Sequence, residues 1–244
     1  MTSTKADLIY SSPHSKIKDF SFDAQVVEVF PDMIKRSVPG YSTIIETIGY
    51  LSNNYVRDNT NIYDLGCSLG AATLAMRQNI IAKNCQIVGI DNSSAMVDRC
   101  KMHINAFKGA TPCTIIKGDI LETKLENVSM VVLNFTLQFI DKEKRQQLLT
   151  KIANGLNKGG ILVLSEKMSH QDEQCHQLLT DLHHDFKRAN GYSDLEIAQK
   201  RTALEQVMKP DSLETHFNRF EQAGFSHAST WFQCFNFVSM VAIK

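Results

Sequence analysis

The turn sequence Asp64-Leu65-Gly66-Cys67-Ser68-Leu69-Gly70 lies between a strand-like apolar run and a helical pattern that begins near Ala71. Glycines in such a turn let the backbone approach a ligand closely. The dinucleotide fingerprint Gly-x-Gly-x-x-Gly would need glycine at position 68, where this chain has Ser68. The two glycines therefore predict a wider loop, with less need to cradle a pyrophosphate.

Strand-like and helical patterns alternate outward from this loop. Short runs rich in Val and Ile predict five strands, at residues 61–66, 86–91, 113–120, 129–135 and 160–166. Helices between them predict an α/β fold with a doubly wound, mostly parallel sheet and right-handed crossovers. Residues 225–244 hold two β-rich runs joined too tightly for a helical crossover. We therefore expect seven strands, with an antiparallel C-terminal hairpin at the sheet edge.

The remaining segments are assigned around this sheet within a single predicted domain, residues 1–244. Residues 1–20 are polar and predict a loose arm, and residues 21–58 predict a helical cap. Within the cap we expect a loop over residues 29–41 and a helix with the capping box Thr43-x-x-Glu46. A stop segment at 157–160 should end the helix before the fifth strand. Residues 169–210 predict a helical insertion.

Composition bounds the class of protein. With 43% apolar and 21% charged residues, the 244-residue chain can bury a sizeable core. Lys plus Arg number 26 and Asp plus Glu number 26, so no net field draws the chain to polyanions. The start lacks an apolar secretion signal, no apolar run is long enough to span a bilayer, and the six cysteines form no C-x-x-C pair. We expect a soluble, cytoplasmic protein without membrane association.

Polar side chains follow the predicted strands at their carboxyl ends, where open α/β sheets bind ligands. Asp91 lies 21 residues beyond Gly70, where a doubly wound fold places the carboxylate that accepts hydrogen bonds from ribose. An alternative for Asp91 is capping of the next helix, a role that Ser93 or Ser94 can take instead. Asp119 and Asn134 end the third and fourth strands in the same manner.

Together these residues resemble the class I S-adenosylmethionine (SAM)-dependent methyltransferases. In that family the loop faces the methionine part, the acidic residue after the second strand holds ribose, and the Asp after the third strand touches adenine. The resemblance carries these roles onto Gly66 to Ser68, Asp91 with Asn92, and Asp119 with Ile120. Residues 134–139 lack the Asn-Pro-Pro-Tyr arrangement of many amino-methylating relatives, so no methyl-acceptor apparatus is visible.

A closer resemblance, over almost the whole chain, is to the carboxy-SAM synthases of the bacterial pathway to 5-oxyacetyluridine in tRNA. The matching segments are residues 29–45, 64–77, 89–100, 133–140, 191–208 and 231–237. This resemblance implies conversion of SAM and prephenate into carboxy-SAM and phenylpyruvate, and a homodimer. It implies a ligand-binding set of Tyr41, Gly66, Cys67, Ser68, Asp91, Asn92, Asp119, Ile120, Asn134 and Arg201.

A mechanism is expected on this basis. The acidic methyl group of the sulfonium can become an ylide, which captures the carbon dioxide that prephenate releases as its ring aromatises. Arg201 is predicted to bind the new carboxylate, because a guanidinium binds carboxylates bidentately and stays charged. Tyr41 is predicted to donate a hydrogen bond or close over the ligand. Cys67 is expected to serve as a small neutral side chain, because no partner base is apparent.

The sequence also bears on metal binding, on tRNA binding and on two alternative functions. We expect no metal site, since the adjacent His183 and His184 face different directions on a helix. Without net positive charge or a Lys/Arg cluster the chain should not bind tRNA tightly, so its product would pass to a separate tRNA-modifying transferase. The rivals are a conventional SAM-dependent methyltransferase acting on a small molecule or RNA, and a non-catalytic nucleotide-binding protein. The mass of the product separates all three.

Overall fold

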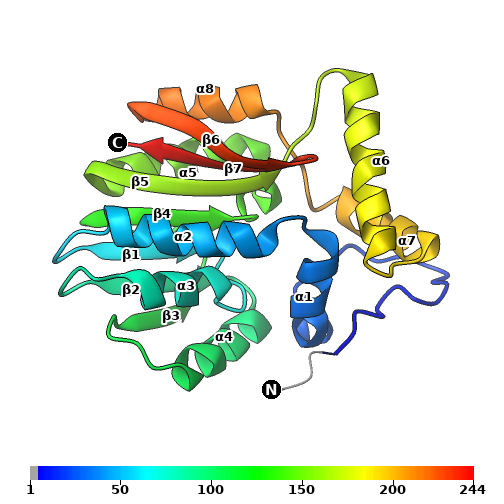
Figure 1. Cartoon of the computed structure of the whole chain (residues 1–244), viewed down its shortest axis with the longest axis horizontal. Coiled ribbons are helices and arrows are strands. Elements are labelled where there is room, and N and C mark those ends of the chain that lie inside the picture. Colours follow the sequence, from blue (N-terminus) through cyan, green and yellow to red (C-terminus); the bar gives the residue numbers. More distant parts are fainter. Residues whose placement is uncertain (1–4) are drawn as a thin grey trace.

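The computed structural model describes residues 5–244, and within them one seven-stranded sheet runs through the molecule in the order β3-β2-β1-β4-β5-β7-β6 (Figure 1). Its strands are β1 (Asn61–Leu65), β2 (Gln86–Asp91), β3 (Cys113–Lys117), β4 (Val128–Asn134), β5 (Leu156–Lys167), β6 (His227–Cys234) and β7 (Phe237–Ile243). The first five strands pair in parallel, whereas β7 pairs antiparallel with both β5 and β6. The predicted sheet and its antiparallel hairpin are confirmed.

Helices cover both faces of this sheet. They are α1 (Ala24–Ser37), α2 (Tyr41–Tyr55), α3 (Ala71–Asn79), α4 (Ser94–Ala106), α5 (Lys142–Gly155), α6 (Glu173–Ala189), α7 (Asp194–Glu205) and α8 (Leu213–Ala223), with a 3-10 turn η1 (Leu137–Phe139). One core joins α5 and α8 to the sheet through Leu149, Ile152 and Phe220. A second core joins α2 and α3 to the opposite face through Ile48 and Met76.

The cap differs from the predicted loop at residues 29–41. Helix α1 runs through this segment with Pro31 inside it, although proline removes one helical hydrogen bond. Asp23 caps the helix by accepting a hydrogen bond from the backbone N–H of Val26 at 3.0 Å. Buried side chains of α1 pack against Leu69 and Met96, and this burial offsets the lost hydrogen bond.

The predicted capping box at Thr43 and Glu46 is wrong. Helix α2 begins at Tyr41, and its N-cap is Gly40, three residues before Thr43, with a positive φ of 71°. A side chain at position 40 would have a Cβ 2.2 Å from the ring of Phe232, so only glycine fits there. The start of α2 is therefore set by the close contact between the backbone of Gly40 and the ring of Phe232 on β6.

The stop segment predicted at residues 157–160 belongs instead to β5. The segment pairs with the end of the chain: the N–H of Gly159 donates to the carbonyl of Lys244 at 2.8 Å, and the N–H of Lys244 donates to Gly160 at 3.0 Å. Helix α5 ends at Gly155, and the strand begins immediately after it. The sequence of this segment is polar and contains two glycines, so it did not indicate a strand. Its pairing partner lies more than eighty residues away in the chain.

The arm, residues 5–20, has no helix or strand among its described residues, but it is not loose. Asp7 is 1% exposed. The backbone N–H of His14 donates to the side chain of Gln199 at 2.8 Å, and the N–H of Phe20 donates to the carbonyl of Ala203 at 2.9 Å. The arm is therefore fixed on α7. Residues 1–4 lie outside the described residues.

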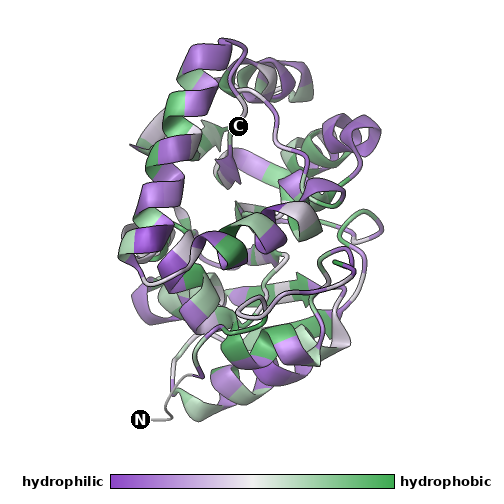
Figure 2. Cartoon of the chain, turned by 90° about the vertical axis from the view of Figure 1, so that its right-hand side faces the viewer, coloured by the Kyte–Doolittle hydropathy of each residue, from purple (hydrophilic) through white to green (hydrophobic). Residues whose placement is uncertain are grey.

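The insertion predicted at residues 169–210 is helical and consists of α6 and α7. Both helices and the arm lie over the end of the sheet at which the parallel strands finish (Figures 1 and 2). Within residues 5–244, no helix combines the length and the hydropathy needed to cross a membrane. The loops that follow the strands thus lie beneath a helical cover.

Candidate functional site

The loop after β1 is held in a tight, left-handed path. Gly66, Ser68 and Gly70 have positive φ values of 84°, 49° and 85°. The N–H groups of Gly66 and Cys67 donate to the carbonyl of Ile90 at 2.8 and 2.9 Å, which fastens the loop to β2. A Cβ on Gly66 would lie 2.3 Å from the hydroxyl of Thr136, which follows β4. The backbone at Gly66 must therefore be bare.

Asp91, the last residue of β2, organises the edge beside this loop. One carboxylate oxygen accepts a hydrogen bond from the N–H of Ser68 at 2.9 Å, and the other accepts from the N–H of Ser93 at 2.9 Å. Burial raises the pKa of Asp91, while these backbone hydrogen bonds act in the opposite direction. Ser93, not Asp91, caps α4 by accepting from Met96 at 3.2 Å. The carboxylate is thus not used as a helix cap.

Asp119 and Ile120 follow β3, next to the end of β2 in the sheet. Asp119 is exposed, and its carboxylate accepts a hydrogen bond from the N–H of Leu121 at 2.8 Å. Ile120 is 6% exposed and packs into the core. The N–H of Gly118 donates to the backbone carbonyl of Asp91 at 3.0 Å, which ties this loop to the end of β2. Asn92 is exposed beside it.

Asn134 and Tyr41 complete the inner side of the edge. The side-chain oxygen of Asn134 is buried with no hydrogen-bond partner among the described residues. Phe135 follows with a positive φ of 59°, and its ring centroid lies 6.5 Å from that of Tyr41. Burial, reinforced by the negative charge of Asp64, raises the pKa of the Tyr41 hydroxyl, so the phenol is neutral and can donate.

Asp64 and Cys67 support the loop from below. Asp64 is 1% exposed and accepts a hydrogen bond from the hydroxyl of Thr73 at 2.6 Å. Its burial raises the pKa of the carboxyl to about 6, despite that hydrogen bond. A hydrogen bond with Cys100 and burial both raise the pKa of the Cys67 thiol. The thiol is therefore neutral, and it packs with Val97.

Arg201 stands apart from the other predicted residues. It lies on the exposed side of α7, and we find no hydrogen bond or ion pair to its guanidinium from residues 5–244. It is close enough to α6 to influence His184, whose pKa is lowered by burial and by the charges of Lys187, Lys167 and Arg201. Among residues 5–244, no hydrogen bond or ion pair therefore joins Arg201 to the loop residues.

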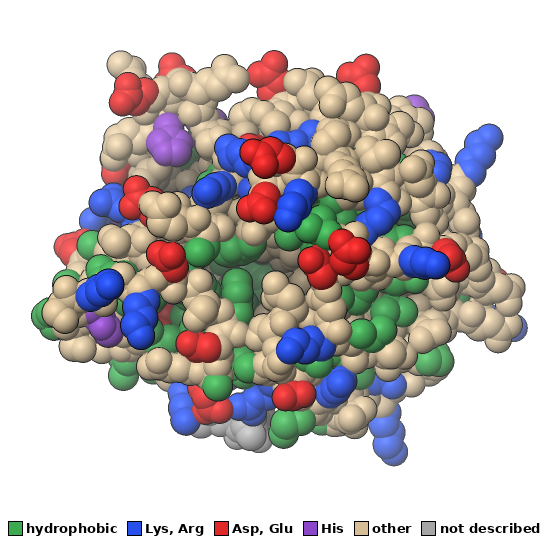
Figure 3. Space-filling model, turned by 180° about the vertical axis from the view of Figure 1, so that it is seen from behind, with side chains coloured by type: hydrophobic (Ala, Val, Ile, Leu, Met, Phe, Trp, Pro, Cys, Tyr) green, Lys and Arg blue, Asp and Glu red, His purple; other side chains and the backbone are tan. Residues whose placement is uncertain are grey.

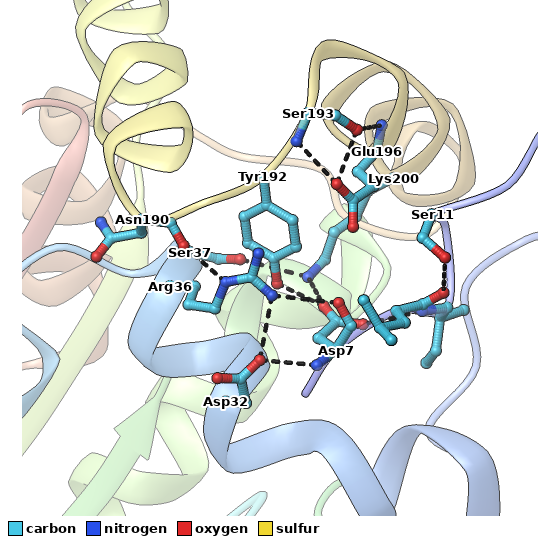
Figure 4. A network of polar contacts seen from close by, with 12 residues as sticks. Asp7, Ser11, Asp32, Arg36, Ser37, Asn190, Tyr192, Ser193, Glu196 and Lys200 are labelled. Carbon is cyan, nitrogen blue, oxygen red and sulfur yellow. Dashed lines mark hydrogen bonds and ion pairs between the residues drawn. The ribbon is translucent and has the colours of Figure 1, made fainter. Parts of the chain in front are cut away.

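A network of polar contacts that no sequence motif indicates joins the arm, α1 and the insertion (Figure 4). The hydroxyl of Tyr192 donates to the carboxylate of Asp7 at 2.5 Å, and the ammonium of Lys200 lies 3.3 Å from the same oxygen. Arg36 donates to the carbonyl of Asp7 at 3.2 Å and stacks on Tyr192, with 3.8 Å from its central carbon to the ring centroid.

Lys167 and Lys187 were not predicted as site residues, and His183 was considered only as a metal ligand, although Lys167 ends β5 and the other two lie on the inner face of α6. Lys167 ends β5 as Asp91 ends β2, and that position was an available signal. His183 and Lys187 are four residues apart on α6 and share a face, which periodicity could have shown. His183 is 4% exposed and Lys187 is 7% exposed.

The surface is hollowed near its centre when it is seen from behind, with hydrophobic side chains at the floor and charges of both signs around the rim (Figure 3). A groove of about 1010 Å³ lies between the 119–126 loop and α5, and Asp119 is the only predicted site residue in its lining. No three His, Cys, Asp or Glu side chains among residues 5–244 are grouped so as to hold a metal ion.

The sheet order, the glycine loop and the acidic strand ends define the fold of the class I methyltransferases. A family model for a methyltransferase domain matches residues 62–160. The human N-acetylserotonin methyltransferase, solved with SAM, superposes with a TM-score of 0.62 at 18% identity, covering 91% of this chain and 55% of that chain. An O-methyltransferase family protein from Burkholderia thailandensis gives 0.65 at 14%, covering 91% and 60%. This chain thus spans little more than half of each of those proteins, and they bear on the fold alone.

Curated relatives narrow the class. The carboxy-S-adenosyl-L-methionine synthase of Colwellia psychrerythraea is 65% identical over 244 residues, which is 100% of both chains. The synthase of the same name from Yersinia pestis (strain Pestoides F) is 60% identical over 238 residues, covering 98% of this chain and 89% of the relative. The chain belongs to the carboxy-S-adenosyl-L-methionine synthase family, and the predicted resemblance to this family is confirmed.

Proposed function

We propose that this enzyme converts SAM and prephenate into carboxy-SAM and phenylpyruvate. The observation that carries the proposal is the full-length identity of 65% to a carboxy-SAM synthase, on a fold whose strand ends present the expected nucleoside-binding set. Asp91 would accept hydrogen bonds from ribose, Asp119 and Ile120 would border adenine, and the loop from Gly66 to Ser68 would face the methionine part.

The proposed reaction balances without an external oxidant or reductant. In prephenate, the bond between the ring and its carboxylate breaks, and the electron pair enters the ring. The ring aromatises as the bond to the ring hydroxyl breaks and hydroxide leaves. The SAM methyl group loses a proton and becomes an ylide, and this proton combines with the hydroxide to form water. The ylide carbon then forms a bond to the released carbon dioxide. The products are phenylpyruvate and the carboxymethyl sulfonium.

Arg201 and Tyr41 are the residues proposed to act on the reacting end. The neutral phenol of Tyr41 can donate a hydrogen bond at the inner edge, beside Phe135. Arg201 would bind the new carboxylate through its guanidinium. Since it is exposed on α7, contact with the ligand requires that α7 approach the edge or that a second subunit present its own Arg201.

A homodimer is proposed together with this role. Leu178 and Leu182, four residues apart on α6, are 60% and 38% exposed, and Leu195 on α7 is 39% exposed. A second subunit could cover these apolar side chains. Sedimentation equilibrium should give twice the chain mass. If the enzyme stays monomeric and still reads the carboxylate through Arg201, the residue acts within its own chain.

The product is proposed to pass to a separate tRNA-modifying transferase. The chain has 26 basic and 26 acidic residues, so little counterion release is available to drive tRNA binding. Submicromolar, strongly salt-dependent binding of tRNA by this protein would contradict the proposal. A cytoplasmic setting is proposed because all six cysteines are free, as is usual in a reducing compartment.

Native mass spectrometry of the purified protein tests the main proposal. We expect a bound ligand with the mass of SAM plus one carbon dioxide. Recovery of S-adenosylhomocysteine together with methyl transfer to an acceptor would instead favour a conventional methyltransferase.

A further inference from the structure

Three lysines lie close together where the insertion meets the sheet: Lys167 at the end of β5, Lys187 on α6 and Lys200 on α7. Lys187 and Lys200 are 7% and 5% exposed, and Lys167 is half-buried at the end of β5. The ammonium of Lys200 has partners, since it lies 3.3 Å from the carboxylate of Asp7 and 3.3 Å from the hydroxyl of Ser37. The ammonium groups of Lys167 and Lys187 have no ion pair and no hydrogen bond from residues 5–244.

The pKa values of both ammonium groups are lowered, as expected for cations without a counter-ion. Burial lowers the pKa of Lys167 to about 8. Burial and the charges of Lys200 and Lys167 lower the pKa of Lys187 to about 7, against a weaker opposing effect of Asp7. Burying a cation without a counter-ion is unfavourable, and like charges close together add to the cost. A bound anion would relieve both effects, so the cluster is suited to a carboxylate.

Aromatic side chains that are buried or half-buried, Phe237 and Phe135, connect this cluster to the nucleoside edge. The ammonium of Lys167 lies 6.0 Å from the ring centroid of Phe237. That ring is 5.9 Å from the ring of Phe135, the residue directly after Asn134, and Phe135 in turn neighbours Tyr41. A ligand held by the lysines with its ring on Phe237 would therefore lie next to the residues proposed to hold SAM.

His183 provides a second, independent sign of a ligand. Its ring lies 4.8 Å from that of Phe237, and its Nε2 lies 2.8 Å from the carbonyl of Ser37, so Nε2 carries the hydrogen. The other nitrogen, Nδ1, is buried without a partner among the described residues. Burial and the neighbouring lysines lower the pKa of His183 to about 2, so Nδ1 keeps its lone pair and can accept a hydrogen bond from a ligand hydroxyl.

We propose that Lys167 and Lys187 bind the pyruvyl carboxylate of prephenate, with the ring of the substrate against Phe237 and His183. This inference rests on the proposed function and adds the binding site of the second substrate. Prephenate carries two carboxylates, an apolar ring and one hydroxyl, which match the cations, the aromatic surface and the free acceptor.

The chemistry selects one of the two carboxylates. The ring carboxylate loses its charge as carbon dioxide forms, so a cation bound to it would stabilise the substrate more than the transition state and slow the reaction. The pyruvyl carboxylate keeps its charge in phenylpyruvate. The lysines therefore anchor the group that does not react and leave the ring carboxylate free to break away near the sulfonium.

Lys167→Met and Lys187→Met test the site, because methionine keeps the length of the side chain and removes the charge. In each variant we expect the KM for prephenate to rise at least about tenfold, with SAM affinity by calorimetry unchanged. Thermal stability should be equal or higher, because the charge that is removed has no counter-ion among residues 5–244 and lies close to other lysines. The control is Lys101→Met, on the exposed side of α4, which should change none of these quantities. Lys167→Gln and Lys187→Gln replace any methionine variant that does not fold.

Phenylpyruvate then distinguishes the two carboxylates. It retains only the pyruvyl group, so it should compete with prephenate in the wild-type enzyme, and its inhibition constant should rise in both lysine variants about as much as the KM does. An unchanged KM for prephenate, an unchanged inhibition constant, or equal weakening of SAM would overturn the inference. Failure of the wild-type enzyme to form carboxy-SAM would instead overturn the proposed function.

Discussion

The backbone N–H of Ser68 lies 2.9 Å from a carboxylate oxygen of Asp91, so the ligand loop after β1 is fastened to the end of β2 by a charged acceptor. The same carboxylate accepts a second hydrogen bond from Ser93. Asp91 therefore shapes the loop and, in the proposed function, also receives the ribose hydroxyls.

Asp91→Asn should weaken SAM binding at least about tenfold, because the amide keeps the shape but loses charged hydrogen bonds worth about 1.5–3 kcal/mol each. Calorimetric titration measures this. Asp58→Asn is the matched control: Asp58 is exposed and accepts a backbone hydrogen bond from Lys83 at 2.8 Å, far from the edge. If both variants bind SAM like the wild type, Asp91 does not hold the nucleoside.

Gly66→Ala should damage the loop in two ways. The residue has a φ of 84°, and the new Cβ would meet the hydroxyl of Thr136 at 2.3 Å. Gly224→Ala is the control, because its φ is 91° and nothing lies within 4 Å of its Cβ. Each variant should lose about 1–2 kcal/mol of unfolding free energy from backbone strain, measured by urea denaturation. Only Gly66→Ala should also lose SAM affinity, and equal affinities would refute the close approach.

Arg201→Ala should lower affinity for carboxy-SAM at least about tenfold and affinity for SAM much less, since only the former has the extra carboxylate. Arg201→Lys should recover part of the loss, because it keeps the charge without the bidentate fork. Arg201 is exposed and unpaired among residues 5–244, so we expect unfolding free energies within about 0.5 kcal/mol of the wild type. Equal weakening of both ligands would show that Arg201 does not read the carboxylate.

Asp211, which follows the insertion, predicts a dependence of stability on pH. Burial alone would raise the pKa of Asp211, but hydrogen bonds from Arg219 and Lys142 and the charge of the fully buried Arg145 lower it to about 2. A carboxyl whose pKa falls on folding stabilises the fold above its unfolded value of 3.8, and the stabilisation disappears as pH falls through about 2.

Asp211→Asn should therefore lose about 2 kcal/mol of unfolding free energy near neutral pH. The comparison is the difference between wild type and variant. Burial and, to a smaller extent, the charge of Asp211 raise the pKa of the buried Glu166, so this carboxyl acts on stability in the opposite direction in both proteins and less strongly in the variant. Urea denaturation from about pH 6 down to about pH 2 should show the difference shrinking. A difference that stays constant with pH would mean that the Asp211 ion pairs do not supply the stability.

The sequence predicted the sheet and the residues at its carboxyl edge because those features are local, while the ligand roles of these residues stay predictions. Short apolar runs set the strands, and the residues directly after β1 to β4 include the glycine loop, Asp91, Asp119 and Asn134. The helix through Pro31 was missed because its stability comes from burial against Leu69 and Met96, which propensity does not reveal.

Contacts between distant segments account for the other differences. The arm is fixed because Asp7 meets Tyr192, 185 residues along the chain, and no local pattern encodes that pairing. Lys167 and Lys187 look like ordinary surface lysines in the sequence. Their burial depends on tertiary packing, in which α6 contacts α1 and α7 and its His183 meets Phe237 of β7. The position of Arg201 relative to the ligand depends on the insertion, which no strand pattern locates.

The most direct test of the account follows an isotopic label from prephenate into the product. The wild-type enzyme is incubated with SAM and with prephenate labelled either at the ring carboxyl or at the pyruvyl carboxyl, and both products are identified by mass spectrometry. We predict that the ring label appears in carboxy-SAM and the pyruvyl label remains in phenylpyruvate. Formation of S-adenosylhomocysteine without carboxy-SAM, or carboxy-SAM that lacks the ring label, would contradict the proposed carboxyl transfer.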